Sequence, residues 1–483
     1  MAANFWELEH PPERLAVVDV HSGRERTYGE LRADVELAAA EMRPEIASRT
    51  PSGKSLIMLL AQNRYESLVA YLAALHSGDA LVLVDATLNR ELLLRLIETY
   101  RPDRICGTAA SAENFPRYRE RQAGDSGIKI WENEKPEATA IHQSLALLLN
   151  TSGSTGSPKL VRLSGENLRA NAASIASYLQ LSADERPITS LPMAYSYGLS
   201  VINSHLLAGA TLVLSEHGVL RREFWDSVDK HGCSSIAGVP YTYQMLLQTG
   251  LLKKRGATLR TVTQAGGALA ETYVRQMHDV ARERGFKFFV MYGQTEATAR
   301  ISYLPFENLA AKVGSIGVAI PGGALQVESE TGELIYSGDN VMLGYAESRD
   351  DLAKGDELHG VLKTGDLARQ DADGFFYVTG RMKRFLKMFG KRFNLDEVEQ
   401  IVQGRFGFPT ACFGRDDLLM LALEAGSENS DAVIAMLSET FGVPKSAVRV
   451  QAVAELPRTI RGKIDYQALA ARNQSEVAAS QAR

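Results

Sequence analysis

The segment 147–159 combines residue types that suit phosphate binding. An apolar run, Leu-Leu-Leu-Asn, leads into a loop of small hydroxylated residues and glycines that ends in a lysine. Glycines let the backbone approach an anion and point N–H groups at it, hydroxyls add donors, and the lysine adds positive charge. The pattern predicts a polyphosphate-binding loop made of Thr151, Ser152, Gly153, Ser154, Thr155, Gly156 and Lys159.

Two other interpretations of this loop are a flexible turn and the P-loop of kinases and ATPases. A P-loop needs Gly, four residues, and then Gly-Lys-Ser/Thr. Gly153 and Gly156 are too close together for that pattern, and Lys159 precedes a leucine instead of a hydroxyl. An amphipathic segment at about 166–179, with Ser164 as its N-cap, predicts a helix after the loop and favours an ordered site.

Composition indicates a multidomain globular enzyme. The chain has 483 residues, more than one ordinary core accommodates, with 45% hydrophobic and 23% charged residues. A net charge of -5 argues against a nucleic-acid partner. No run approaches 18 apolar residues and the N-terminus lacks a signal-peptide pattern, so we expect a cytoplasmic protein without a membrane span. The widely spaced Cys106, Cys233 and Cys412 predict neither a disulfide framework nor a zinc site.

Strand and helix patterns alternate through the first 291 residues. Three apolar strands and two helices alternate between about 55 and 107, after a helix that opens with a capping box at 27–30. The alternation resumes from about 198 to 291. Such patterns predict two doubly wound α/β sheets with helices on both faces.

The pattern changes in the last third of the chain. Short alternating runs between about 313 and 379 predict a small β subdomain, and helices mixed with strands after 381 predict an α+β domain. The expected domains are therefore 1–380 and 381–483, with the boundary at Gly380 and Arg381. The polar tail 473–483 is expected to be disordered.

Five further segments, in order along the chain, carry residues suited to a nucleotide site. They are 265–268 (Ala-Gly-Gly-Ala), 292–296 (Tyr-Gly-Gln-Thr-Glu), 363–366 (Lys-Thr-Gly-Asp), 380–381 (Gly-Arg) and 457–463 (Pro-Arg-Thr-Ile-Arg-Gly-Lys). With the loop at 151–159 they resemble the motifs of the adenylate-forming (ANL) superfamily, which includes acyl- and aryl-CoA synthetases, peptide-synthetase adenylation domains and luciferases. The resemblance covers about 27–469 and implies a mobile C-terminal lid.

The resemblance implies a role for most of these residues. Tyr292 would stack on adenine, Thr295 would bond the α-phosphate, Glu296 would help to hold Mg²⁺, and Asp366 would accept both ribose hydroxyls. The other residues expected to bind nucleotide are Gly266, Gly267, Ala268, Gly293, Gln294 and Arg381. The basic run 381–392, which includes Arg384, is interpreted as a hinge that faces phosphate.

The reaction implied is ATP-dependent activation of a carboxylic acid. The carboxylate of the acid attacks the α-phosphorus in line and pyrophosphate leaves, so that the protein supplies positioning and charge neutralisation. Lys463 would bridge the attacking oxygen and the α-phosphate, which makes Lys463, Thr295 and Glu296 the expected catalytic residues. The alternative is an acyl-adenylate-binding or nucleotide-binding protein with little or no turnover.

A second half-reaction would transfer the acyl group to a thiol, either CoA or the phosphopantetheine of an acyl or peptidyl carrier protein. Lys383 occupies the hinge position of the family, and Gly390 matches the glycine beside which the pantetheine arm passes. The resemblance also implies that acylation of Lys463 would remove its charge and switch off adenylation.

The segments around 195 and 239 bear on the identity of the acid. Tyr195 stands where amino-acid activators carry an aspartate, so an α-amino acid is disfavoured. No countercharge is evident among the aromatic residues of this region, which favours a small aliphatic or aryl acid with a neutral tail. The residues expected to contact the acid are Tyr195, Tyr197, Val201, Gly238, Val239 and Tyr243.

Overall fold

A computed structural model describes most of the chain. The described residues are 4–43, 53–107, 115, 117–121, 124–150, 159–382, 384–388, 391–415, 417–441, 443–459, 463–466, 468–469 and 471. The chain forms two compact units, the first comprising Met1–Leu325 and Tyr336–Leu362 and the second comprising Gln326–Ile335 and Lys363–Arg483. The second unit thus takes over the chain at Lys363, before the expected boundary at Gly380 and Arg381. That boundary stays a prediction about the hinge.

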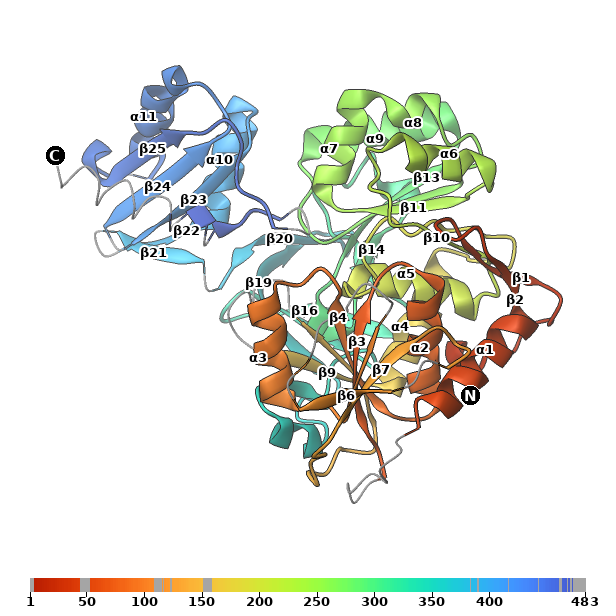
Figure 1. Ribbon diagram of the computed structural model, residues 1–483. Helices are drawn as coiled ribbons and strands as arrows, with labels where there is room; N and C mark the ends of the chain where they lie inside the picture. Colours follow the sequence, from red (N-terminus) through yellow and green to blue (C-terminus); the bar gives the residue numbers. More distant parts are fainter. Residues whose placement is uncertain are drawn as a thin grey trace. The chain divides into compact units, whose positions relative to one another are not determined.

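The largest sheet of the first unit has eight strands in the order β18-β9-β8-β4-β3-β5-β7-β6 (Figure 1). Its parallel centre consists of β3 (Leu56–Ala61), β4 (Ala80–Asp85), β5 (Arg104–Gly107) and β8 (Leu145–Asn150). Antiparallel strands flank this centre: β6 (Tyr118–Glu120), β7 (Lys129–Asn133), β9 (Leu160–Ser164) and β18 (Gly344–Ala346).

Helices cover both faces of this sheet. In β3, Ile57 and Leu59 pack in one core cluster with residues of α1 (Tyr28–Glu41) and α2 (Tyr65–His76). Met58 and Leu60 point to the opposite face and pack with residues of α3 (Arg90–Tyr100). This alternation follows from the two-residue period of a strand. Figure 1 shows α3 and α2 on opposite sides of β3 and β4.

A second sheet of the first unit has the order β11-β12-β13-β14-β15. Its first three strands are parallel and the last two are antiparallel, so this sheet is mixed. The strands are β11 (Ser235–Gly238), β12 (Thr261–Gln264), β13 (Lys287–Tyr292), β14 (Ser302–Leu304) and β15 (Val318–Ala319). The helices of this region are α4 (Gly165–Tyr178), α5 (Ser196–Leu207), α6 (Arg222–Lys230), α7 (Pro240–Thr249), α8 (Leu251–Lys254) and α9 (Glu271–Arg284).

Smaller elements complete the two units. A three-stranded sheet has the order β10-β1-β2, with β1 (Leu15–Asp19), β2 (Glu25–Thr27) and β10 (Leu212–Leu214). A four-stranded sheet has the order β16-β17-β19-β20, with β16 (Gly323–Val327), β17 (Glu333–Gly338), β19 (Val361–Gln370) and β20 (Phe376–Arg381). Short 3₁₀ helices cover Phe5–Glu7, Thr295–Ala297, Phe306–Asn308, Arg349–Ala353, Ser427–Asn429 and Lys445–Ala447.

The rest of the second unit is an α+β arrangement, drawn in blue in Figure 1. The hairpin β21 (Phe385–Met388) and β22 (Lys391–Asn394) is followed by α10 (Leu395–Phe406) and α11 (Ser430–Phe441). These helices pack with β23 (Thr410–Arg415), β24 (Leu418–Leu423) and β25 (Val448–Ala452), which form a sheet in that order.

The expected fold class is confirmed: a large α/β unit precedes a smaller α+β unit. The capping box is present, because Glu30 N donates to Thr27 Oγ1 and Thr27 N donates to the Glu30 carboxylate. Ser164 caps α4 as expected. The three cysteines are buried and free. Within the described residues, no helix is long and apolar enough to cross a membrane.

Candidate functional site

The predicted phosphate loop connects two antiparallel strands of the large sheet. Asn150 at the end of β8 pairs with Leu160 at the start of β9. Residues Thr151, Ser152, Gly153, Ser154, Thr155 and Gly156 lie outside the described residues. Lys159 is described, and its Nζ lies 3.8 Å from the ring centroid of Tyr345 and 3.6 Å from Oε1 of Glu347. The chain therefore continues as strand β9 after the loop, before helix α4 begins.

Tyr345 also contacts the carboxylate of Glu296. Its hydroxyl donates to Oε1 of Glu296 over 2.9 Å. Burial, reinforced by the nearby carboxylate of Glu296, raises the pKa of the Tyr345 phenol, which therefore stays protonated and keeps donating. One aromatic side chain thus contacts both Lys159 and Glu296, which are 137 residues apart in the sequence. Sequence reasoning missed Tyr345.

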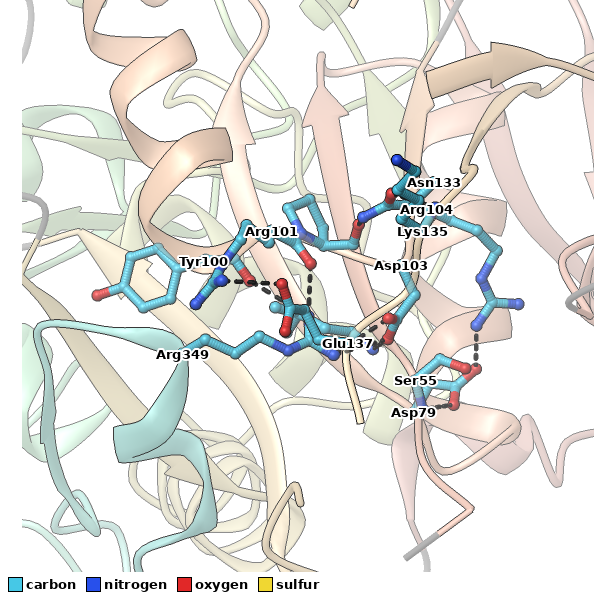
Figure 2. A network of polar contacts seen from close by, with 12 residues as sticks. Ser55, Asp79, Tyr100, Arg101, Asp103, Arg104, Asn133, Lys135, Glu137 and Arg349 are labelled. Carbon is cyan, nitrogen blue, oxygen red and sulfur yellow. Dashed lines mark hydrogen bonds and ion pairs between the residues drawn. The ribbon is translucent and has the colours of Figure 1, made fainter. Parts of the chain in front are cut away.

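Buried arginines hold β18, the strand that carries Tyr345. Arg162 of β9 donates to the carbonyl of Tyr345 at 3.0 Å and to that of Leu343 at 3.2 Å, and pairs with the carboxylate of Glu357. Arg349, just after β18, pairs with Asp103 at 3.0 Å, as Figure 2 shows. These bonds tie β18 to the large sheet at both ends and so fix the position of Tyr345.

The segment 292–301 makes a tight turn that only glycine permits at position 293. A Cβ on Gly293 would lie 1.9 Å from the carbonyl oxygen of Ala299. Thr298 adopts φ 63°, an uncommon value for a residue other than glycine. Asn340 stabilises the turn: its Nδ2 donates to the carbonyls of Ala297 and Arg300, both at 2.9 Å. Asn340 was not predicted.

The turn places Thr295 against helix α5. Thr295 is buried, and its Oγ1 lies 3.2 Å from Oγ of Ser196, the first residue of α5. Gln294 Nε2 donates to the hydroxyl of Tyr292 over 3.3 Å. The predicted motif residues 292–296 therefore lie at the end of β13 and in the turn that leads to β14.

The segment 265–268 also requires glycine. Gly266 has φ 84°, and a Cβ there would lie 2.4 Å from the Tyr195 hydroxyl oxygen. Gln264, which is fully buried, donates to the carbonyl of Gly267 over 2.8 Å. Tyr195, predicted as a substrate residue, thus lies beside the predicted adenine segment. The bare backbone of Gly266, Gly267 and Ala268 suits the edge or face of a flat ring.

The predicted acid-binding residues form part of one buried cluster. Tyr195, Tyr197 and Val239 belong to it, and Val201 packs against it. The Tyr197 hydroxyl donates to the carbonyl of Thr263 over 2.8 Å, so this hydroxyl is committed to strand β12. Tyr243 is fully buried and donates to the same carbonyl, and a Cβ on Gly238 would lie 2.9 Å from its ring.

The expectation that no countercharge lies in this region is wrong. The guanidinium of Arg300 lies over the ring of Tyr197, with its Cζ 3.9 Å from the ring centroid. Arg300 is 2% exposed. Arg300 follows Glu296 by only four residues. The direction of its side chain depends on the tight turn at Thr298, which was not predicted.

In the second unit, Asp366 and Arg381 are directly paired across β19 and β20. Nε of Arg381 lies 3.1 Å from Oδ1 of Asp366, and Asp366 is buried. Gly365 adopts φ 73° and donates its N–H to Oε1 of Glu333 over 2.9 Å. This geometry presents a fixed carboxylate beside a cation, and the ribose and nucleotide contacts of these two residues stay predictions.

Lys463 lies beside the segment 458–459 in the second unit. Its carbonyl accepts from the N–H of Thr459 over 2.7 Å, and Arg458 and Ile464 form an antiparallel bridge. Lys463 is half-buried. The positions Lys383 and Gly390 lie outside the described residues.

The interpretation of the basic run as facing phosphate is wrong for Arg384. Its guanidinium pairs with Asp396 and, at 2.8 Å, with Glu399, and lies over the ring of Tyr466. Although burial opposes it, these carboxylate contacts raise the pKa of Arg384. Arg384 therefore anchors the segment after Lys463 to helix α10 and is not available for phosphate.

Comparisons with known proteins identify the family and the fold of the chain. The family described as AMP-binding enzyme matches residues 5–346. A sulfoacetate–CoA ligase of Cupriavidus necator is 26% identical, covering 94% of each chain, and a 2-succinylbenzoate–CoA ligase of Bacillus subtilis is 27% identical, covering 81% of this chain and 80% of the ligase. The ATP-bound structure of MatB from Rhodopseudomonas palustris has the same fold, with a TM-score of 0.76, 21% identity and coverage of 97% and 98%.

Proposed function

The chain belongs to the AMP-binding enzyme family, and from that premise we propose how its residues activate a carboxylic acid with ATP and pass the acyl group to CoA. The chain is an AMP-forming acid–thiol ligase. The observation that carries the assignment of roles is the contact of Tyr345 with both Lys159 and Glu296, because it brings a cation and a carboxylate to one place beside the predicted phosphate loop.

The residues around Tyr345, namely Lys159 and Glu296, fit a magnesium–nucleotide complex. Within the described residues, no group of three or more His, Cys, Asp or Glu side chains could hold a metal ion on its own. Glu296 is a single carboxylate that is held by Tyr345, and Mg²⁺ binds through one or two carboxylates together with substrate phosphates. Mg²⁺ bound there would neutralise charge on the phosphates. We assign Glu296 as its protein ligand.

We assign the remaining roles by the resemblance of the motifs. Lys159 and the loop 151–156 bind the departing pyrophosphate, Thr295 donates its hydroxyl to the α-phosphate, and Tyr292 stacks on the adenine above Gly266 and Gly267. In the second unit, the Asp366 carboxylate accepts the ribose hydroxyls while Arg381 holds that carboxylate in place.

Lys463 neutralises charge in the first half-reaction. The carboxylate of the acid forms a bond to the α-phosphorus as the bond to pyrophosphate breaks, which yields the acyl-adenylate and pyrophosphate. A lysine that touches both the attacking oxygen and the α-phosphate stabilises the transition state more than the ground state. We assign this role to Lys463.

In the second half-reaction, a thiol displaces AMP from the acyl-adenylate. We propose free CoA as the acceptor, because the similar ligases are named as CoA ligases. The phosphopantetheine of a carrier protein is the alternative. Lys383 and Gly390 are proposed as the hinge and the pantetheine contact of this step.

Product analysis with one substitution tests both half-reactions. The wild-type protein, ATP, Mg²⁺ and an acid panel should give pyrophosphate, AMP and acyl-CoA when CoA is present. Gly390→Leu should still form the acyl-adenylate but not the thioester, because a side chain would obstruct the pantetheine arm. Formation of ADP, or nucleotide binding without any turnover on the whole panel, would contradict the assignment.

A further inference from the structure

Arg300 is a buried cation that pairs with no carboxylate in the part of the chain that the structure describes. Its side chain is 2% exposed, and its Nε and Nη1 have no hydrogen-bond partner within the described part of the chain. A guanidinium remains protonated in proteins, so burial cannot neutralise it by deprotonation. A buried charge that lacks a partner carries a large desolvation penalty. Such a group is expected to meet an anion in the working protein.

The other fully buried arginines of the first unit differ from Arg300 in this respect. Arg104 pairs with Asp79 at 3.2 Å and Arg349 pairs with Asp103 at 3.0 Å, as Figure 2 shows. Arg162 pairs with Glu357. Arg300 makes no such pair with any carboxylate in the described ranges. The fold thus supplies a carboxylate to each of these three arginines, and it is the lack of a carboxylate that distinguishes Arg300, since Nε and Nη1 of Arg104 also have no hydrogen-bond partner among the described residues.

The position of Arg300 is fixed, and it lies in the predicted acid-binding region. Asn340 and Asn171 both donate side-chain N–H groups to its carbonyl, at 2.9 and 3.3 Å. Its guanidinium stacks on Tyr197, which shares a buried cluster with Tyr195 and Val239. A guanidinium stacked on an aromatic ring keeps its nitrogen donors in its own plane, where they can bind an anion. In Arg300, Nε and Nη1 are the donors that have no partner among the described residues.

The guanidinium of Arg300 also hydrogen-bonds to the hydroxyl of Tyr178. Tyr178 belongs to the same cluster, and although burial raises the pKa of its phenol, the adjacent Arg300 counteracts part of that rise. The Tyr178 hydroxyl donates over 3.0 Å to the sulfur of Met291, which is a weak acceptor. An anion at Arg300 would offer this hydroxyl a better acceptor.

We propose that Arg300 binds a second anionic group, a carboxylate or a sulfonate, on the acid that the enzyme activates. This inference rests on the proposed function, and it names the substrate class as acids with two acidic groups. One acidic group reacts with ATP, while the other forms charge-assisted hydrogen bonds with the guanidinium above Tyr197. Arg300 is a specificity residue in this account, because it contacts a part of the acid that does not react.

Matched pairs of acids test the proposal. Each pair contains a dicarboxylic or sulfocarboxylic acid of stated chain length and its neutral counterpart, in which an amide or a methyl group replaces the second acidic group. The wild-type protein should prefer the charged member of at least one pair by about 10- to 100-fold in kcat/KM, the size expected for a charge-assisted hydrogen bond. Arg300→Met should abolish or invert that preference, and Arg300→Lys should retain part of it.

The controls separate specificity from folding and from nucleotide binding. Arg222→Met removes the same charge from an exposed side chain and should leave the preference unchanged. If Arg300→Met does not fold, the preference for the charged acid is compared between the wild-type protein and Arg300→Lys, and this comparison decides the outcome. Preference for neutral acids in every pair, or an equal loss for both members together with a raised KM for ATP, would overturn the proposal. If no acid of either kind yields AMP and pyrophosphate, the proposed function fails instead.

Discussion

The hydroxyl of Tyr345 donates a 2.9 Å hydrogen bond to Glu296, and the ring of the same residue lies 3.8 Å below the ammonium of Lys159. One side chain on β18 therefore orients the proposed metal ligand and the proposed pyrophosphate-binding lysine together. Because buried arginines hold β18 at both ends, the orientation is set before any ligand binds.

We expect Tyr345→Phe to weaken the use of MgATP. The substitution keeps the ring that contacts Lys159 but removes the hydrogen bond to a charged group, which is worth roughly 1.5–3 kcal/mol. kcat/KM for MgATP should fall by about tenfold or more, measured by pyrophosphate release over a titration of Mg²⁺. Tyr377→Phe removes a comparable bond to Asp371 outside the proposed site and should have no such effect. Equal values for Tyr345→Phe and the wild-type protein would remove this residue from the account.

Gly293→Ala should be strongly damaging. The new Cβ would lie 1.9 Å from the carbonyl of Ala299, so the turn that carries Thr295 and Glu296 must move. We expect a loss of at least about tenfold in adenylation, since displacements of about 1 Å cost on the order of 10²-fold.

Gly404→Ala is the matched control for that substitution. Gly404 is exposed in helix α10, and a Cβ there meets nothing within 4 Å. It should leave activity unchanged and raise the free energy of unfolding by up to about 1 kcal/mol, because alanine favours helix. Normal adenylation by Gly293→Ala would show that the turn is not needed in the form described.

Stability should fall in mild acid because of His205. This residue is buried on α5, its Nε2 has no partner among the described residues, and burial lowers its pKa from 6.5 to about 4. Between these two values the unfolded chain binds more protons than the folded chain, so unfolding becomes easier as the pH falls through this window. The loss amounts to roughly 3 kcal/mol from this group, at about 1.4 kcal/mol for each pKa unit.

Chemical denaturation at several pH values measures this effect. His205→Gln cannot take up the proton, so its free energy of unfolding should vary less between pH 6.5 and 4 than that of the wild-type protein. His217→Gln is a control, because His217 is exposed. The same steep pH dependence in His205→Gln and in the wild-type protein would assign the effect to other groups.

The helices and strands that were predicted correctly follow from patterns among neighbouring residues. The capping box at Thr27 and Glu30 and the strand β4 follow from patterns within a few residues, and both were located correctly. Strand β9 was missed because its short run of Leu-Val-Arg-Leu-Ser lies between a loop and a helix, where its partner strands are not evident.

The contacts made by side chains distant in the sequence could not be predicted in this way. Tyr345, Asn340 and Arg300 act through partners that the fold brings together, such as the pairing of β18 with β9. Arg384 shows the converse case. It belongs to a basic run, but helix α10 supplies Asp396 and Glu399 as partners, so its charge is used inside the second unit.

The measurement that tests the central claim most directly is acid-dependent exchange of pyrophosphate into ATP, compared between the wild-type protein and Lys463→Ala. The account predicts exchange that requires both an acid and Mg²⁺, and a loss of roughly 10²- to 10³-fold in Lys463→Ala, because a charge-stabilising donor is removed. Exchange at a near-normal rate in Lys463→Ala, or exchange that does not depend on any acid, would contradict it.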